Sequence, residues 1–113
     1  MYRVVKQSEG SVRKVADNKT VVNLITKEIT EAFSLAVIEA QDYSEEETTT
    51  YNRAYYILEG NLEIISDGIA QTLQEGDSCF INENTTYKMQ GTFKTIVINQ
   101  PAYGASPMPR AQF

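Results

Sequence analysis

The stretch YNRAYYILEGNLEI, from Tyr51 to Ile64, decides the fold of this chain, and LQEGDSCFINENTTY, from Leu73 to Tyr87, extends the pattern. The first stretch is rich in aromatic and aliphatic residues that favour strands. It carries Gly60-Asn61 as a turn signal and continues through NLEIIS to Asp67-Gly68, the strongest short hairpin signal in the chain. The sequence therefore predicts antiparallel strands joined by tight turns.

Further strand signals lie on both sides of this stretch. FSLAVIEA, residues 33–40, is mostly apolar and indicates a buried strand, and SCFI, TYKMQ and FKTIVINQ predict three more after a second turn at residues 75–77. RVVK and KTVVNLI near the N-terminus suit strands, while TKEITEAF, residues 26–33, fits either a short helix or an exposed strand. The turns recur about every eight to twelve residues, which is typical of an all-β sandwich or barrel.

Composition excludes several classes of function. A length of 113 residues fits one domain, and a net charge of −5 argues against a nucleic-acid partner. No apolar run is long enough for a signal peptide or a membrane span, so we expect no membrane partner. Cys79 is the only cysteine, which fits a reducing compartment, and its alternation with Ile81 favours a small buried apolar residue over a nucleophile. We expect a cytoplasmic protein.

The two opening stretches resemble the two sequence motifs of the cupin superfamily. Gly60 falls at the glycine of the first motif, YYILEG is similar to the frequent YVLEG strand end, and Gly76-Asp77 begins the second motif. The resemblance covers roughly residues 33–101 and implies a double-stranded β-helix, a jelly-roll barrel, within a single domain of residues 1–113. Residues 102–113, which hold two of the three prolines, would form an extended tail.

A narrower resemblance points to the ethanolamine-utilisation cupins, which often carry a tyrosine and an acidic pair before a similar strand. The segment TYNRAYYILEG has Tyr51 at that tyrosine, with Asn52 and Arg53 in place of the acidic pair. The exchange of acidic residues for an amide and a cation puts any acid-dependent activity of that subfamily in question for this chain.

The cupin resemblance also implies that the usual metal ligands are replaced. Arg53 falls at the metal-binding glutamate, and Tyr87 falls at the histidine of the second motif. The usual histidine pair falls either on Glu47 and Thr49 or on Glu46 and Thr48. The chain has no histidine at all, and a guanidinium cannot ligate a metal and repels a cation. We therefore expect a metal-free pocket and no cofactor.

Alternation along a strand places Tyr51, Arg53 and Tyr55 on one face. With the cupin alignment this face points into the barrel, where Tyr87 joins it from a facing strand. An arginine offers a fork of donors suited to carboxylate or phosphate, and tyrosines add hydroxyls and flat apolar walls. The expected ligand is a small anionic or sugar-like metabolite. Alternatively, Arg53 pairs internally with Glu47 or Glu63, and SEEETTT, residues 44–50, is a solvated loop.

Three functions fit these features. The first is a metal-free protein that binds a metabolite without converting it, with Tyr51, Arg53, Tyr55, Tyr87 and Glu47 around the ligand. The second is an isomerase or small-molecule transferase in which a tyrosine near Arg53, its pKa lowered by the cation, exchanges protons with the substrate. The third is a self-assembling structural or interaction protein. The resemblance also implies a homodimer, for which the apolar VVNLI, residues 21–25, would pair across a two-fold axis.

Overall fold

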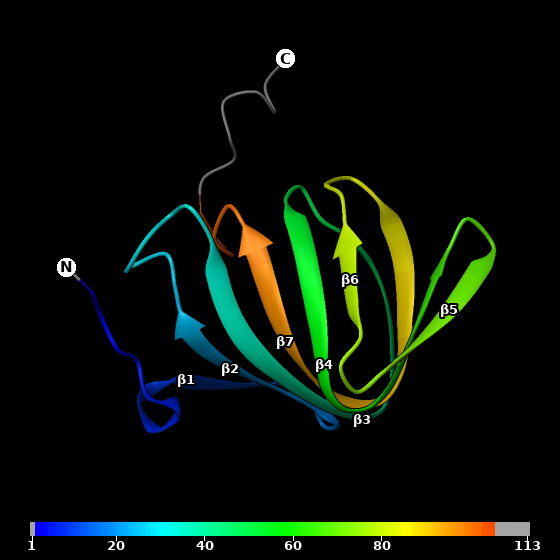
Figure 1. The fold of residues 1–113 in the computed structure, drawn as a ribbon, viewed down its shortest axis with the longest axis horizontal. Helices are drawn as coiled ribbons and strands as arrows, with labels where there is room; N and C mark the ends of the chain where they lie inside the picture. Colours follow the sequence, from blue (N-terminus) through cyan, green and yellow to red (C-terminus); the bar gives the residue numbers. More distant parts are fainter. Residues whose placement is uncertain (1, 106–113) are drawn as a thin grey trace, which may run out of the picture.

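The computed structural model describes residues 2–105, and within them the fold is almost entirely β-structure (Figure 1). A short 3-10 helix, η1 (Gln7–Glu9), precedes seven strands. The strands are β1 (Ser11–Ala16), β2 (Lys19–Ile25), β3 (Ser34–Thr48), β4 (Asn52–Ser66), β5 (Ile69–Gln74), β6 (Ser78–Ile81) and β7 (Thr86–Gln100). They pair antiparallel in the order β1-β2-β3-β7-β4-β5, and β6 pairs with β4. The predicted all-β jelly-roll barrel is confirmed.

Three long strands shape the barrel because each of them bends near its middle. β3, β4 and β7 are each 15 residues long, and Figure 1 shows them curving through the bottom of the molecule from one wall to the other. The pairing of β3 with β7 breaks register between Ala40 and Tyr43, and that of β4 with β7 breaks between Ile57 and Glu59. One wall then holds β1, β2 and β6 beside the long strands, and the other holds β5.

Glycines mark these bends, and two predicted boundaries are wrong for that reason. Gly60, taken as part of a turn, lies inside β4 with φ +80°, and residues 86–100 form one strand where two were predicted. A Cβ on Gly60 would lie 2.2 Å from the carbonyl oxygen of Thr92, and one on Gly91 would lie 2.3 Å from that of Asn61. Close backbone approach with positive φ is what an irregularity inside a strand requires, whereas the chain does not reverse there.

Of the remaining local predictions, one is confirmed and the others are wrong. The Asp67-Gly68 hairpin is confirmed, because both residues have positive φ and Ser66 pairs with Ile69. The segment RVVK lies outside every strand, while β1 was not predicted, and residues 26–33 form turns and bends that are neither helix nor strand. Residues 44–48, predicted as a solvated loop, belong to β3, because pairing with β7 overrides their loop-like composition.

The core lies between the two walls and is built from the inward side of each strand. Along β4, Arg53, Tyr55 and Ile57 are buried while Tyr56 is 46% exposed, so the predicted face is confirmed. The largest fully buried side chains come from β4 and β7: Tyr55, Ile57, Leu62, Tyr87, Met89 and Thr95. Cys79 is partly buried and packs against this core, as expected.

The apolar segment VVNLI does not form the free sheet edge that was expected near the N-terminus. β2, which contains VVNLI, pairs with β1 on one side and β3 on the other, so it has no free edge for pairing with a second copy. The predicted tail begins at Ala102, which is buried and donates its N–H to the Glu31 carbonyl at 3.0 Å; residues 106–113 lie outside the described residues. Among residues 2–105, no helix is long and apolar enough to cross a membrane.

Candidate functional site

The five predicted site residues meet in one hydrogen-bonded cluster centred on Arg53. Its side chain is only 7% exposed, and it donates to oxygen atoms of five different side chains. Nε donates to Asn99 Oδ1 (2.7 Å), Nη1 to Glu47 Oε2 (2.8 Å), Tyr87 Oη (3.1 Å) and Tyr55 Oη (3.3 Å), and Nη2 to Tyr51 Oη (3.2 Å). The internal pairing of Arg53 with Glu47, an alternative raised by the sequence, is therefore present.

Strand register brings these residues together. Arg53 on β4 lies directly opposite Asn99 on β7, and Glu47 on β3 lies opposite Tyr87, also on β7. Tyr87 in turn donates to Glu47 at 3.1 Å and shares a 2.7 Å hydrogen bond with Tyr55. Three neighbouring strands thus converge on one guanidinium, which no single stretch of sequence could show.

The structure also decides which register applies to the replaced histidine pair. Along β3 and the residues after it, Glu45, Glu47 and Thr49 are at least partly buried, whereas Glu46 and Thr48 are exposed. Glu47 and Thr49 therefore hold the inward positions. Thr49 donates to the Tyr51 carbonyl at 2.8 Å and so helps to fix the chain between β3 and β4.

Burial controls the ionisation of the cluster. It would lower the pKa of Arg53, but the tyrosines around the guanidinium and Glu47 outweigh it and raise that pKa, so Arg53 stays charged. The pKa values of Tyr51, Tyr55 and Tyr87 are all raised, first of all by burial, although Arg53 acts in the opposite direction. The expectation of a lowered tyrosine pKa is wrong, because burial destabilises the phenolate form more than the nearby cation stabilises it.

A cavity of about 130 Å³ lies inside the barrel next to this cluster. Arg53 and Glu47 line it, while Tyr51, Tyr55 and Tyr87 are not among its lining residues and support Arg53 from behind. The charged lining consists of three cations and two carboxylates: Arg13, Lys19, Arg53, Glu45 and Glu47. Its apolar lining is Val15, Val21, Ala36, Ile38 and Val97, and Asn23, Ser34, Asn99 and Tyr103 complete it.

A second ion pair in the cavity was missed by the sequence reasoning. Lys19 Nζ lies 3.2 Å from Glu45 Oε2 and 4.8 Å from the ring centre of Tyr43, whose hydroxyl donates to the same Glu45 oxygen. The signal was present in the alternation of strand residues. Lys19 shares a face with Val21, and Glu45 shares a face with Glu47. A cation and a carboxylate on inward positions of two strands should have been added to the site.

A family model and solved structures show which known proteins this chain resembles. The family model described as "Ethanolamine utilisation protein EutQ" matches residues 3–106. The chain belongs to the EutQ family. A search of curated proteins finds no significant match.

Solved structures agree with the fold of a EutQ-family chain. A putative ethanolamine utilization protein Q from Salmonella typhimurium LT2 has a TM-score of 0.70 at 17% identity, covering 74% of this chain and 70% of that one. The EutQ protein of Clostridium difficile gives 0.69 at 21% identity, with 88% and 82% covered. An RmlC-like cupin from Shewanella frigidimarina gives 0.79 at 15% identity, with 92% and 95% covered. These similarities establish a cupin fold.

The donor set at the site does not fit the histidine-bound metal that many cupins carry. Arg53 occupies the centre, where its permanent charge repels a metal ion, and its neighbours are phenols in their neutral form. Within residues 2–105, no group of three or more His, Cys, Asp or Glu side chains is placed to hold a metal. Glu45 and Glu47 remain as carboxylate donors, each already held by a cation. We derive no chemistry through a metal in this EutQ-family site.

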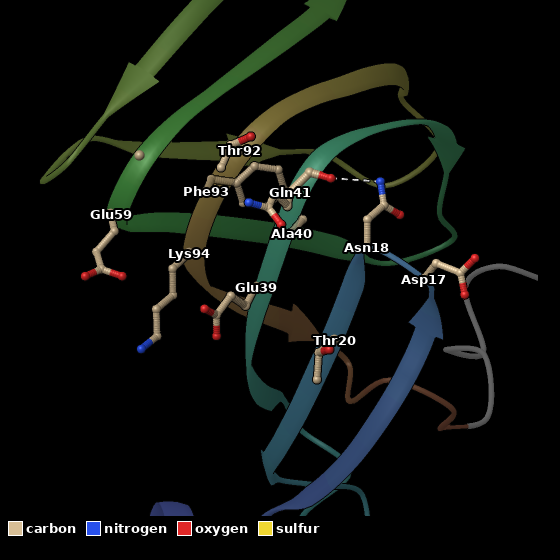
Figure 2. Close-up of a pocket in the computed structure, with 11 residues that line it drawn as sticks. Asp17, Asn18, Thr20, Glu39, Ala40, Gln41, Glu59, Thr92, Phe93 and Lys94 are labelled. Atoms are coloured by element: carbon tan, nitrogen blue, oxygen red, sulfur yellow. Dashed lines mark hydrogen bonds between the residues drawn. The ribbon is translucent and has the colours of Figure 1, made fainter.

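A larger hollow of about 360 Å³ lies on the outside of the barrel near the bends, and Figure 2 shows the residues that line it. Three of its four charged residues, Glu39, Lys94 and Glu59, are cross-strand neighbours on β3, β7 and β4, and the fourth is Asp17. Both glutamates are exposed, so their interactions are screened by water. The barrel cavity is the better candidate, because four of its five charged side chains are at least partly buried and held in ion pairs, whereas Arg13 is exposed.

Proposed function

We propose that this EutQ-family protein binds a small anionic or sugar-like metabolite in the barrel cavity, without converting it and without a bound metal. The observation that carries this proposal is the charge of the lining. Three cations and two carboxylates face a small cavity in a chain whose net charge is −5. Positive charge is therefore enriched where a ligand would lie, and this favours an anion.

The arrangement of the polar groups supports binding of a hydroxylated molecule. Glu45 and Glu47 lie two residues apart on the same face of β3, and each is fixed by a cation and a tyrosine hydroxyl. Preorganised donors and acceptors inside an apolar wall orient a small ligand at little cost in ordering. The family description connects such proteins with ethanolamine utilisation, and we propose that the ligand is a small metabolite met in that process.

Acid–base catalysis is less well supported. The tyrosines around Arg53 have raised pKa values and so keep their protons near neutral pH. Glu47 is held by Arg53 and Tyr87, and the chain has no histidine to exchange protons in that range. An isomerase or transferase using tyrosine and glutamate would need at least one of these groups to titrate near neutral pH.

A calorimetric binding screen of small carboxylates, sugar acids and sugars against the wild-type protein tests the proposal. We expect at least one compound to bind, with Glu45→Gln and Glu47→Gln each weakening it about tenfold. Glu46→Gln is the matched control, because Glu46 lies between them on the outward face of β3 and should leave binding unchanged. A screen without binding, or equal loss in all three variants, contradicts the proposed site.

The metal-free part of the proposal is tested by thermal unfolding of metal-stripped protein with added Mn, Fe, Ni or Zn ions. An ion that binds only the folded state raises its stability by about 2.7 kcal/mol at a hundredfold excess over Kd. We expect no saturable shift, because Arg53 holds the central position. A saturable shift with one ion, lost in Glu45→Gln and Glu47→Gln, would reverse this part of the proposal.

We also propose that the protein pairs with a second copy through the outward face of the β3–β7–β4–β6 wall. Phe80 is 62% exposed and Ile98 38% exposed there, and with Phe33 and Ala54 they line a surface hollow of about 340 Å³. The segment FSLAVIEA, residues 33–40, is apolar at nearly every position, which is typical of a strand covered on both faces. In a two-fold interface the same patch of each copy meets the other, and the apolar residues of this hollow can pack together without bringing like charges into contact.

Sedimentation tests this pairing. We expect a dimer at micromolar concentration that Phe80→Glu dissociates, because each copy would then bury an unpaired carboxylate in an apolar interface. Ile69→Glu is the matched control, since Ile69 is 65% exposed on β5 in the other wall. A wild-type monomer, or equal dissociation by both variants, would count against the proposed face.

A further inference from the structure

We propose that Arg13, on the edge strand β1, binds the carboxylate of the ligand at the mouth of the cavity, while Glu45 and Glu47 accept hydrogen bonds from its hydroxyl groups. The ligand is then a small hydroxylated carboxylic acid, held with its charged end outward. This inference rests on the proposed function and names the class of ligand and its orientation.

Strand pairing directs Arg13 over the cavity. Arg13 lies opposite Val21 on β2, and Val21 is 5% exposed and points into the barrel. Paired residues on neighbouring strands share a face, so the Arg13 side chain is on the inner side although β1 is the last strand of the sheet. Both Arg13 and Val21 line the cavity. Lys14, the next residue, lies opposite Thr20 and faces the other side.

An aromatic pair links Arg13 to the buried cluster. The guanidinium carbon of Arg13 lies 5.1 Å from the ring centre of Tyr103, and that ring meets Tyr51 edge-on with 6.3 Å between centres. Tyr51 in turn lies 5.3 Å from the guanidinium carbon of Arg53. Tyr103 is itself anchored, because its backbone N–H donates to Ser34 Oγ at 2.9 Å. The Arg13 guanidinium is thus held over a ring, while its N–H donors make no hydrogen bond with the side chains of the described residues and remain available for a ligand.

The three cations of the cavity differ in what already compensates their charge. Arg53 is paired with Glu47 at 2.8 Å and Lys19 with Glu45 at 3.2 Å. Among the described residues, the Arg13 guanidinium makes no ion pair or side-chain hydrogen bond; it lies over the Tyr103 ring, and its charge also acts on Tyr51. The extra positive charge of the lining is therefore that of Arg13, and a ligand carboxylate gains most there.

The two glutamates have acceptor capacity left on the inner side. All of their hydrogen bonds with described residues use Oε2, and Oε1 of each accepts none. Hydroxyl groups of a ligand can donate to these carboxylate oxygens, whereas the carboxylate of a ligand would be repelled by them. Arg13 and Tyr103 line both this cavity and a second hollow of about 480 Å³. The acid end of a ligand can therefore lie at Arg13 while its hydroxyls reach inward.

Matched compounds separate the two halves of this arrangement. Calorimetry is performed with gluconate, sorbitol and hexanoate, and with the shorter set glycerate, glycerol and propionate. In each set the three compounds have a carbon chain of the same length, and only the first has both a carboxylate and neighbouring hydroxyls. We expect gluconate or glycerate to bind at least about tenfold more tightly than either matched compound, which corresponds to one charge-assisted hydrogen bond at each end.

The variants then locate the carboxylate. Arg13→Gln should weaken binding of the hydroxy acid about tenfold or more and leave its neutral counterpart unchanged, while Lys14→Gln should alter neither by more than about twofold. Equal effects of the two variants, or a larger effect on the neutral compound, overturn the role of Arg13 while the proposed binding function stands. Absence of binding by all six compounds overturns this ligand class, and the wider screen described above then decides the proposed function separately.

Discussion

Glu45 and Glu47 are two residues apart on the same face of β3, yet they belong to two different centres. Each carboxylate accepts hydrogen bonds from one cation and one tyrosine: Lys19 and Tyr43 at Glu45, and Arg53 and Tyr87 at Glu47. The side chains of both cations are nearly buried, at 8% and 7% exposure. Burial therefore does not distinguish the two centres.

The difference lies in how many partners each cation has among the described residues. Arg53 donates to five side-chain oxygens, four of them on β3, β4 and β7 and one on Tyr51 just before β4, whereas Lys19 donates to one carboxylate oxygen and otherwise faces the Tyr43 ring. The Arg53 centre is nearly saturated from within, so its main effect is to hold β3, β4 and β7 in register. The Lys19 centre lines the cavity, and among the described residues its ammonium group uses only one of its three donors.

The largest effect that would separate the two centres is loss of the cation itself. We expect Arg53→Met to destabilise the protein by about 3–5 kcal/mol, because it leaves Glu47 and three tyrosines without their shared donor in a buried site. Lys19→Met should cost about 1–2 kcal/mol, since only Glu45 loses a partner. Urea unfolding at neutral pH measures both, and equal losses would refute the distinction.

A smaller effect concerns the geometry of the cation. Arg53→Lys keeps the charge but replaces a planar fork by a point donor with three hydrogens, so several of the five oxygens lose their partner. We expect a loss of about 1–3 kcal/mol. Lys19→Arg, the reciprocal exchange, should cost less than about 1.5 kcal/mol, because the side chain needs to donate to one oxygen, that of Glu45. Urea unfolding decides, and a harmless Arg53→Lys would show that charge alone holds the centre.

The smallest effect appears in alkaline solution. An unfolded tyrosine loses its proton near pH 10, whereas Tyr51, Tyr55 and Tyr87 have raised pKa values in the folded protein and keep theirs. Above about pH 10 the folded state thus binds more protons than the unfolded state. Stability is fully present below that pH and falls above it, by at most about 1.4 kcal/mol per pH unit for each tyrosine.

The slope is measured as the change in the free energy of unfolding between about pH 10 and 11. Tyr55→Phe should reduce the slope by about the share of one group. The Tyr43 pKa is also raised by burial and by Glu45, but Tyr43 is only partly buried and water screens its charge, so Tyr43→Phe should reduce the slope by less. Tyr56→Phe, on the outward face of β4, is the matched control. An unchanged slope in Tyr55→Phe would mean that this hydroxyl does not ionise on unfolding as expected.

Much of the fold and half of the site could be predicted from local sequence. The Asp67-Gly68 hairpin and the inward face of β4 follow from turn chemistry and from alternation, and both depend only on neighbouring residues. The bends at Gly60 and Gly91 could not be told from turns, because a positive φ serves a hairpin and a strand irregularity equally well. β1 was missed because Val12 and Val15 do not follow the two-residue alternation of a strand and because five of its six residues are exposed.

The sequence by itself determined that Arg53, with tyrosines at alternate positions, lies on the core side of a strand in a chain without histidine. That result needed only the two-residue period of a strand and the motif resemblance. The tertiary structure alone decided that Glu47 and Asn99 close around Arg53, that Lys19 and Glu45 form a second pair, and that Arg13 reaches the cavity mouth. The physical reason is that strand pairing joins residues far apart in the chain, and its register is set by the whole sheet.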